Sequence, residues 1–133
     1  QISSENLVPS EQMGFGGYYS IRGFDARALS STDEGFYLRN ELRSPAMRVG
    51  PKLGCPTLDD RLQFLAFLDY GVAYRHARQP GQDERVTMSS FGPGLRYGIA
   101  QRLDVRVDWG IQWIAPDLPD QGDRLHVGVI LSY

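Results

Sequence analysis

Hydrophobic and polar residues alternate with period two along the second half of the chain. Between Leu103 and Ala115, every odd-numbered position up to Trp113 is apolar, whereas the even-numbered positions carry mainly Asp, Arg, Gly and Gln. Between Arg124 and Tyr133, the odd-numbered positions are again all apolar or aromatic. Alternation sustained over ten or so residues is typical of a β-strand with one apolar face. Both segments are therefore predicted strands.

Three earlier segments follow the same template less regularly, and we predict a strand for each. They are Gly35–Ala46, Leu62–Arg75 and Arg85–Ala100. The pattern of the third is interrupted around Pro93, and a proline inside a strand indicates an edge, a bulge or weak pairing. The sequence thus predicts an all-β chain with about five long strands in an antiparallel meander.

The segments between the predicted strands differ in character. Ala77–Glu84 and Pro116–Asp123 are polar loops that contain Pro and Gly, whereas Gln101-Arg102 is a tight turn and Met47–Arg61 is a longer linker. Residues 1–34 show no sustained period and are predicted as one long loop. Loops of this length without regular structure are usually functional or disordered.

The predicted strands have the length that a membrane crossing requires. At roughly 10 to 14 residues they exceed the usual 5 to 6 of soluble sheets and match a tilted transmembrane strand. Aromatic residues lie near strand ends or beside apolar runs, as in the girdle of a membrane barrel: Tyr70, Tyr74, Tyr97, Trp109, Trp113 and Tyr133. A soluble β-sandwich shows the same alternation, so the pattern alone leaves that alternative open.

The charge balance argues against a nucleic-acid partner. Lys and Arg total 14 and Asp and Glu total 16, giving a formal net charge of −2. A nucleic-acid surface requires a basic excess, which this chain lacks. All the basic residues except Lys52 are Arg, whose forked guanidinium suits ordered hydrogen-bond networks.

The sequence lacks the arrangements that enzymes and metal sites need. His76 and His126 lie far apart, with no third ligand at metal-binding spacing. Asp104 and Asp108 lie four residues apart on one predicted strand, roughly 13 Å by the strand rise, which is too far for a catalytic carboxylate pair. Cys55 has no His nearby in the sequence. We therefore expect neither an enzyme nor a metal or cofactor site.

Several motifs resemble the Omp85 superfamily of outer-membrane proteins. Ile21-Arg22-Gly23-Phe24 is similar to the [VI]-R-G-[FY] tip of that superfamily's long extracellular loop, and Phe67-Leu68-Asp69-Tyr70-Gly71 is similar to its F-x-D-x-G strand motif. Four further segments agree with the superfamily in order and spacing: Leu7–Gln12, Gly16-Gly17, Asn40-Glu41-Leu42 and Ser90–Arg96. The combination resembles the transporters of two-partner secretion, of the haemolysin and filamentous-haemagglutinin secretion type.

The resemblance implies a location and a role for the chain. Residues 1–34 would be the sixth extracellular loop, and residues 35–133 the last strands of a transmembrane barrel of about sixteen strands in the bacterial outer membrane. The complete barrel would export an unfolded client polypeptide without a cofactor, and its other partners would be outer-membrane lipid and the barrel-assembly machinery. One alternative within the superfamily is a factor that assembles or inserts other membrane proteins. Another, from a different class, is a soluble β-sandwich or small-barrel binding module.

The resemblance also implies a contact between the loop tip and the inner wall. Arg22 would meet Asp69, because a guanidinium offers a planar fork of donors that a carboxylate accepts in bidentate fashion. Gly71 beside Asp69 leaves space, Gly23 permits a tight tip, and Phe24 wedges against the wall.

Two further charged residues extend this expected network. Glu41 is a second acceptor for Arg22 on the polar face. Arg96 offers a competing arrangement, in which it pairs with Asp69 and Arg22 is a solvated loop residue. The residues alone leave both arrangements open.

The last predicted strand resembles the C-terminal signal by which outer-membrane barrels are recognised for assembly. Its apolar set is Leu125, Val127, Val129, Leu131 and Tyr133. Two features depart from the family pattern: Tyr133 stands where the terminal residue is usually Phe, and Met47–Arg61 stands where a short periplasmic turn is expected.

Overall fold

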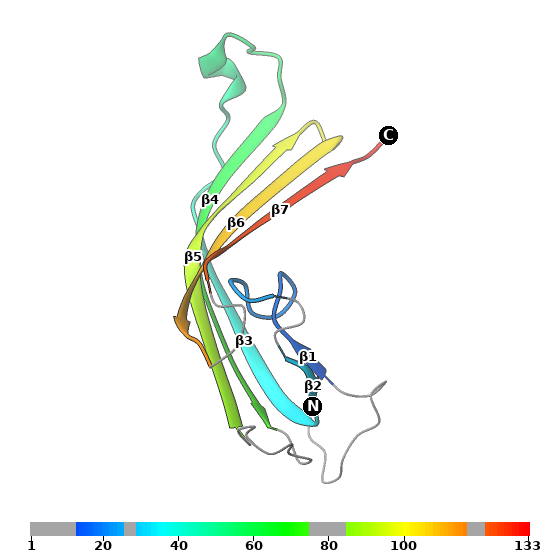
Figure 1. Ribbon diagram of the computed structural model, residues 1–133. Helices are drawn as coiled ribbons and strands as arrows, with labels where there is room; N and C mark the ends of the chain where they lie inside the picture. Colours follow the sequence, from blue (N-terminus) through cyan, green and yellow to red (C-terminus); the bar gives the residue numbers. More distant parts are fainter. Residues whose placement is uncertain (1–12, 26–28, 75–84, 117–121) are drawn as a thin grey trace.

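Five long strands form one open antiparallel sheet in the computed structural model, which describes residues 13–25, 29–74, 85–116 and 122–133 (Figure 1). The strands are β3 (Glu34–Arg43), β4 (Asp60–Tyr74), β5 (Arg85–Ile99), β6 (Leu103–Ile114) and β7 (Arg124–Leu131). Each pairs with its neighbour in sequence, in the order β3-β4-β5-β6-β7. The predicted all-β meander of long strands is confirmed.

The strand ends differ by a few residues from the prediction. β3 stops at Arg43, two residues before Pro45, whose nitrogen has no hydrogen to donate to a ladder. β4 begins earlier than predicted, at Asp60, because its pairing with β5 extends to Asp60 opposite Ile99. β7 ends at Leu131. The predicted loop 77–84, residues 117–121 of the predicted loop 116–123, and the predicted strand end at residue 75 lie outside the described residues.

The prediction that residues 1–34 contain no regular structure is wrong for two short segments. β1 (Met13–Phe15) and β2 (Leu29–Thr32) pair antiparallel in a separate two-stranded sheet. Strands of three and four residues are too short to produce a recognisable alternation. Residues 1–12, which include the motif-like stretch 7–12, and residues 26–28 lie outside the described residues.

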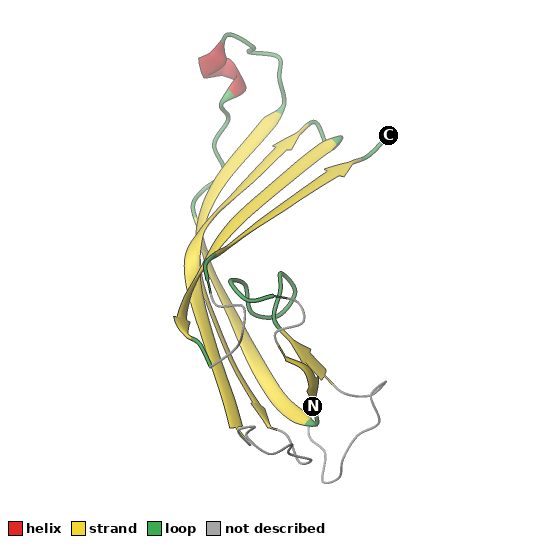
Figure 2. Ribbon diagram, in the orientation of Figure 1, coloured by secondary structure: helices red, strands yellow, loops and turns green. Residues whose placement is uncertain are grey.

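The connection between β3 and β4 is structured and not the short turn that the resemblance implies. It contains a 3₁₀ turn, η1 (Gly50–Leu53), which ends at Gly54 with φ of 83° (Figure 2). The Asp60 carboxylate accepts hydrogen bonds from the backbone N–H groups of Val49 (2.8 Å) and Gly50 (2.9 Å). This end of the sheet lies far from the β1–β2 segment (Figure 1).

The two faces of the curved sheet differ in chemistry. Figure 1 shows the segment between β1 and β2 lying within the concavity of the sheet. In β4, Leu65, Phe67 and Asp69 alternate with exposed neighbours and are at most 5% exposed. The opposite, convex face exposes large apolar side chains: Phe36, Leu38, Phe64, Leu68, Phe91, Trp109, Trp113, Leu125 and Val127. Within the described residues, no helix has the length and apolar character to cross a membrane.

The pairing of β5 with β6 is interrupted where the sequence has Gly92 and Pro93. Pairing runs up to Phe91 opposite Ile111 and resumes at Gly94 opposite Asp108. A side-chain carbon built on Gly92 would lie 1.7 Å from the Trp109 carbonyl oxygen, so the two strands approach too closely for any other residue.

We expect Gly92→Ala to destabilise the protein by about 3 kcal/mol, because the added methyl group forces the two strands apart. Gly98→Ala is the matched control in β5, since its methyl group would meet nothing closer than the Leu103 carbonyl oxygen at 3.7 Å. Equilibrium unfolding in denaturant measures the free energy of unfolding of both variants. Equal unfolding midpoints for the two variants would contradict this account.

Candidate functional site

The loop between β1 and β2 is closed by hydrogen bonds between its own residues. Gly17 donates a backbone hydrogen bond to the carbonyl of Phe24 (2.9 Å), and the Ser20 hydroxyl bonds both the N–H and the carbonyl of Gly16 at 2.7 Å. Gly16, Gly17 and Gly23 have φ of 119°, 80° and 93°, a region that favours glycine. The closed loop presents the four consecutive residues Ile21, Arg22, Gly23 and Phe24, which we call the loop tip, to the concave face.

Arg22 of the loop tip is fully buried and forms a bidentate pair with Asp69 of β4. Its Nε donates to Asp69 Oδ2 (2.7 Å) and its Nη2 to Oδ1 (2.8 Å), while the Arg22 backbone N–H also donates to Oδ2 (3.1 Å). Both side chains have no exposed surface. Burial, the largest single effect, lowers the pKa of the Arg22 guanidinium, but the hydrogen bonds and charges of Asp69 and Glu41 outweigh it and raise the pKa above its ordinary value. Arg22 is therefore a permanent cation.

Two more carboxylates complete the surroundings of Arg22. Glu41 of β3 accepts from Arg22 Nη1 at 2.7 Å, and Asp108 of β6 lies 3.8 Å from the same nitrogen. Arg96, the competing partner for Asp69, instead forms a bidentate pair with Asp108 at 2.8 Å for both bonds. The structure thus brings Arg22 to Asp69 and places Arg96 beside it in the same network.

Apolar contacts accompany the ion pairs. The Arg22 guanidinium carbon lies 3.7 Å from the centre of the Phe67 ring, a cation–π geometry. On either side of Arg22 and Gly23, Ile21 and Phe24 are at most 2% exposed. They form a buried cluster with three side chains of the sheet: Ala73, Val86 and Met88. The loop tip is therefore fixed by packing as well as by charge.

The remaining candidates from the sequence lie in different places. Gly71 is buried in β4, opposite Tyr37 and Met88 of the neighbouring strands. The terminal apolar set does not approach the loop tip. Its members are exposed along β7 and just beyond it: Leu125, Val127, Val129, Leu131 and Tyr133.

Sequence reasoning missed four residues that surround the tip. Asp108, Gly110 and Gln112 of β6 and His126 of β7 all lie within reach of Arg22 or Gly23. The alternation placed these residues on the polar face, which is correct. It carried no signal that β6 passes under the loop tip, because that depends on the register between strands.

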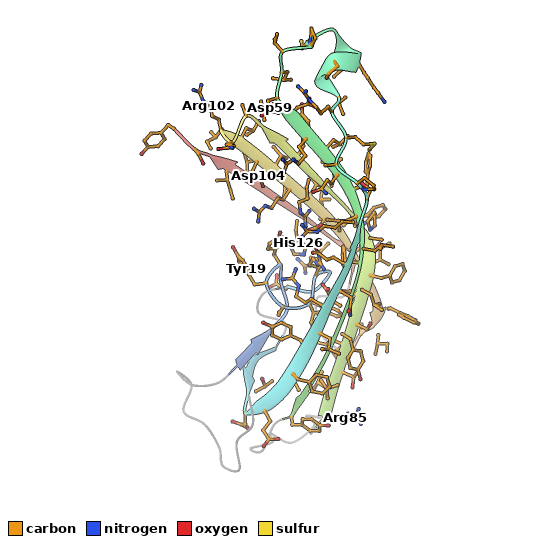
Figure 3. All side chains as sticks on the ribbon, turned by 180° about the vertical axis from the view of Figure 1, so that it is seen from behind. Tyr19, Asp59, Arg85, Arg102, Asp104 and His126 are labelled. Carbon is orange, nitrogen blue, oxygen red and sulfur yellow. The ribbon has the colours of Figure 1, made fainter. Side chains whose placement is uncertain are left out.

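The concave face also contains an open hollow of about 940 Å³ beyond the loop tip. Figure 3 shows Asp59, Arg102 and Asp104 at this end of the sheet, His126 beside the loop, and Arg85 at the opposite end. Six arginines line the hollow: Arg39, Arg43, Arg61, Arg96, Arg102 and Arg106. Acidic residues line it too, so the hollow is polar and charged of both signs.

These features define a class of protein. An antiparallel sheet of long strands, apolar on its convex face and polar on its concave face, with a loop folded into the concavity, is a sector of a transmembrane β-barrel wall.

Comparisons with known proteins identify the family. Residues 1–97 match the model of the haemolysin secretion/activation protein family ShlB/FhaC/HecB, and the chain belongs to this family. It is similar to the outer membrane transporter CdiB of Dickeya dadantii (strain 3937), with 35% identity over 131 residues. That alignment covers 94% of this chain and 21% of the transporter, so the chain spans about a fifth of the relative's length. A comparison with solved structures finds no match.

Family membership settles the class of protein. The predicted resemblance to the haemolysin and filamentous-haemagglutinin secretion type is confirmed, and the similar protein is itself an outer membrane transporter. A soluble β-sandwich, the alternative that the alternation left open, is therefore wrong.

We predict that the two acceptors of Arg22 differ in importance. Asp69 is fully buried and accepts three bonds from Arg22, whereas Glu41 is 20% exposed and accepts one. Removing the charge of a buried partner costs several kcal/mol, but a partly exposed one costs much less. In the full-length protein, Asp69→Asn is expected to release the tip and Glu41→Gln to loosen it slightly.

Trypsin measures this release, because Arg22 has no exposed surface in the docked loop. We expect the rate of cleavage after Arg22 to rise at least about tenfold in Asp69→Asn and only about two- to threefold in Glu41→Gln. Mass spectrometry identifies the cut. A larger effect of Glu41→Gln would show that the ranking by burial is incorrect.

Proposed function

We propose that this chain is the C-terminal sector of an outer-membrane pore that exports an unfolded partner protein by two-partner secretion. The family match and the similarity to an outer-membrane transporter support the proposal. Because an open sheet leaves unpaired backbone groups at both edges, which lipid does not tolerate, the activity belongs to a complete barrel. Among the described residues, β3 and β7 are the outermost strands of the sheet, and the remaining strands would pair there.

Within that barrel, residues 35–133 would be the last five of about sixteen strands, and residues 1–34 the sixth extracellular loop. The convex apolar side chains would face outer-membrane lipid, and the exposed apolar set of β7 would serve the barrel-assembly machinery as a recognition signal. The charged hollow on the concave face would be part of a water-filled lumen. A lumen lined by both signs of charge solvates the backbone and polar side chains of an extended client without binding it tightly.

The observation that carries the mechanism is the complete burial of Arg22 against Asp69. The pair would hold the extracellular loop folded into the lumen in the conformation that transport requires. Neither the docking of the loop nor the passage of the client calls for a cofactor or for covalent chemistry. An assembly factor of the same superfamily would use a similar loop, but the match to the haemolysin secretion/activation family favours export.

We predict that Arg22→Ala or Asp69→Ala in the full-length protein abolishes secretion of the client while leaving membrane insertion largely intact. Each change removes the bidentate pair that ties the loop tip to β4, so the loop loses its position, whereas most of the strand pairing is untouched. Client protein in the medium reports secretion, and heat-modifiable migration in gel electrophoresis reports the folded barrel.

Arg85→Ala is the matched control, because Arg85 is an exposed arginine at the start of β5, at the opposite end of the sheet from the charged hollow (Figure 3). It is expected to secrete normally. Wild-type secretion by both the Arg22 and the Asp69 variants would refute the proposed role of the pair.

A further inference from the structure

The backbone of the loop tip is held on the side away from Asp69 by residues outside the charged network. Gln112 Nε2 of β6 donates to the Gly23 carbonyl oxygen at 2.7 Å. The Gly23 N–H donates to His126 Nε2 of β7 at 3.4 Å, a longer contact. Both peptide groups of Gly23 therefore find partners on the last two strands.

Gly110 makes this approach possible. A side-chain carbon built on Gly110 would lie 2.3 Å from the Gly23 nitrogen and 2.5 Å from its Cα. These are backbone atoms that have no flexible end to turn aside. Any residue with a side chain at this position of β6 would exclude the tip, so the tip sits directly on the backbone of the sheet.

Gln112 also joins the tip to the connection between β6 and β7. Besides the Gly23 carbonyl, its Nε2 donates to the Gly122 carbonyl oxygen at 3.0 Å, and its Oε1 accepts from the Gly122 N–H at 3.4 Å. The amide thus uses both donors of its nitrogen and its oxygen on two loops that are distant in sequence.

We propose that Gly110 and Gln112, here called the β6 cradle, form a second docking point for the loop tip. They are positioning residues: Gly110 provides the space and Gln112 the hydrogen bond that orients Gly23. The cradle ties the tip to the β6–β7 hairpin, independently of the ion pair that ties it to β4. Its importance for secretion rests on the proposed function, but its effect on docking does not.

The test is made on the full-length transporter with two variants and two matched controls. Gln112→Met keeps the length of the side chain and removes its hydrogen bonds, whereas Gly110→Ala adds one methyl group under the tip. Gln63→Met is the control for the first, because within the described part of the chain the Gln63 side chain of β4 bonds the Ser44 carbonyl oxygen, at 3.3 Å, and not the loop tip. Gly98→Ala is the control for the second, since its methyl group would make only an ordinary van der Waals contact, with the Leu103 carbonyl oxygen at 3.7 Å.

Trypsin cleavage after Arg22 measures docking, and client in the medium measures transport. We expect cleavage to accelerate about tenfold in Gln112→Met and more in Gly110→Ala, with both controls unchanged. Heat-modifiable migration confirms that each variant is folded. If Gly110→Ala fails to fold, Gln112→Met alone decides, because it adds no bulk.

The outcomes separate the cradle from the proposed function. Faster cleavage with normal secretion would support the cradle and contradict the view that a docked tip is needed for export. Faster cleavage with reduced secretion supports both. Unchanged protection of Arg22 in Gln112→Met, or equal acceleration in Gln63→Met, would overturn the cradle whatever secretion does.

Discussion

A guanidinium completely withdrawn from water is the constraint on which the rest of this structure depends. Moving an ion into a protein interior costs several kcal/mol unless opposite charges and hydrogen bonds replace the lost water. Arg22 obtains them from Asp69 in two parallel bonds and from Glu41 in a third. The Phe67 ring covers one face of the guanidinium. These contacts, together with the packing of Ile21 and Phe24 against the sheet, fix the position of the loop tip.

The sheet has glycines on its concave face at positions where neighbouring strands or the loop pack too closely for a side chain. Gly92, Gly94 and Gly110 lie on the concave face of β5 and β6, and a carbon built on any of them would collide with a neighbouring atom. At Gly94 the clash would be with Asp108 and Leu65, so its lack of a side chain allows Asp108 to turn toward Arg96. Glycine in a strand interior weakens pairing, and here the paired strands on either side compensate for that weakness.

The sequence predicted the parts of this arrangement that depend on local pattern. Alternation predicts five strands because each strand separates an apolar environment from a polar one along its whole length. The R-G-F tip and the F-x-D-x-G strand directed attention to Arg22 and Asp69 because both are compact motifs. Asp108, Gly110 and Gln112 carried no comparable signal. Alternation reveals the face on which a residue lies, but not which residue of another segment lies opposite.

The length of an element also limited what could be predicted. β1 and β2 are stabilised by pairing with each other, and neither has a periodic sequence pattern of its own. The 3₁₀ turn η1 depends on Asp60, whose carboxylate accepts hydrogen bonds from the backbone of Val49, eleven residues upstream, and Gly50, ten residues upstream. Such tertiary partners are invisible to a reading of neighbouring residues.

The charged network remains compensated even without the arginine of the loop. Asp69 has Arg39 Nε at 3.9 Å, Glu41 has Arg43 at 2.6 Å, and Asp108 has Arg96 at 2.8 Å, all from the sheet itself. Each carboxylate that receives Arg22 therefore keeps a second guanidinium when the loop leaves. Undocking exposes one solvated arginine and leaves no carboxylate stranded without a counter-charge, which lowers the free-energy cost of the undocked state. Because these three additional arginines belong to the sheet itself, the charge balance around each acceptor of Arg22 does not depend on the loop alone.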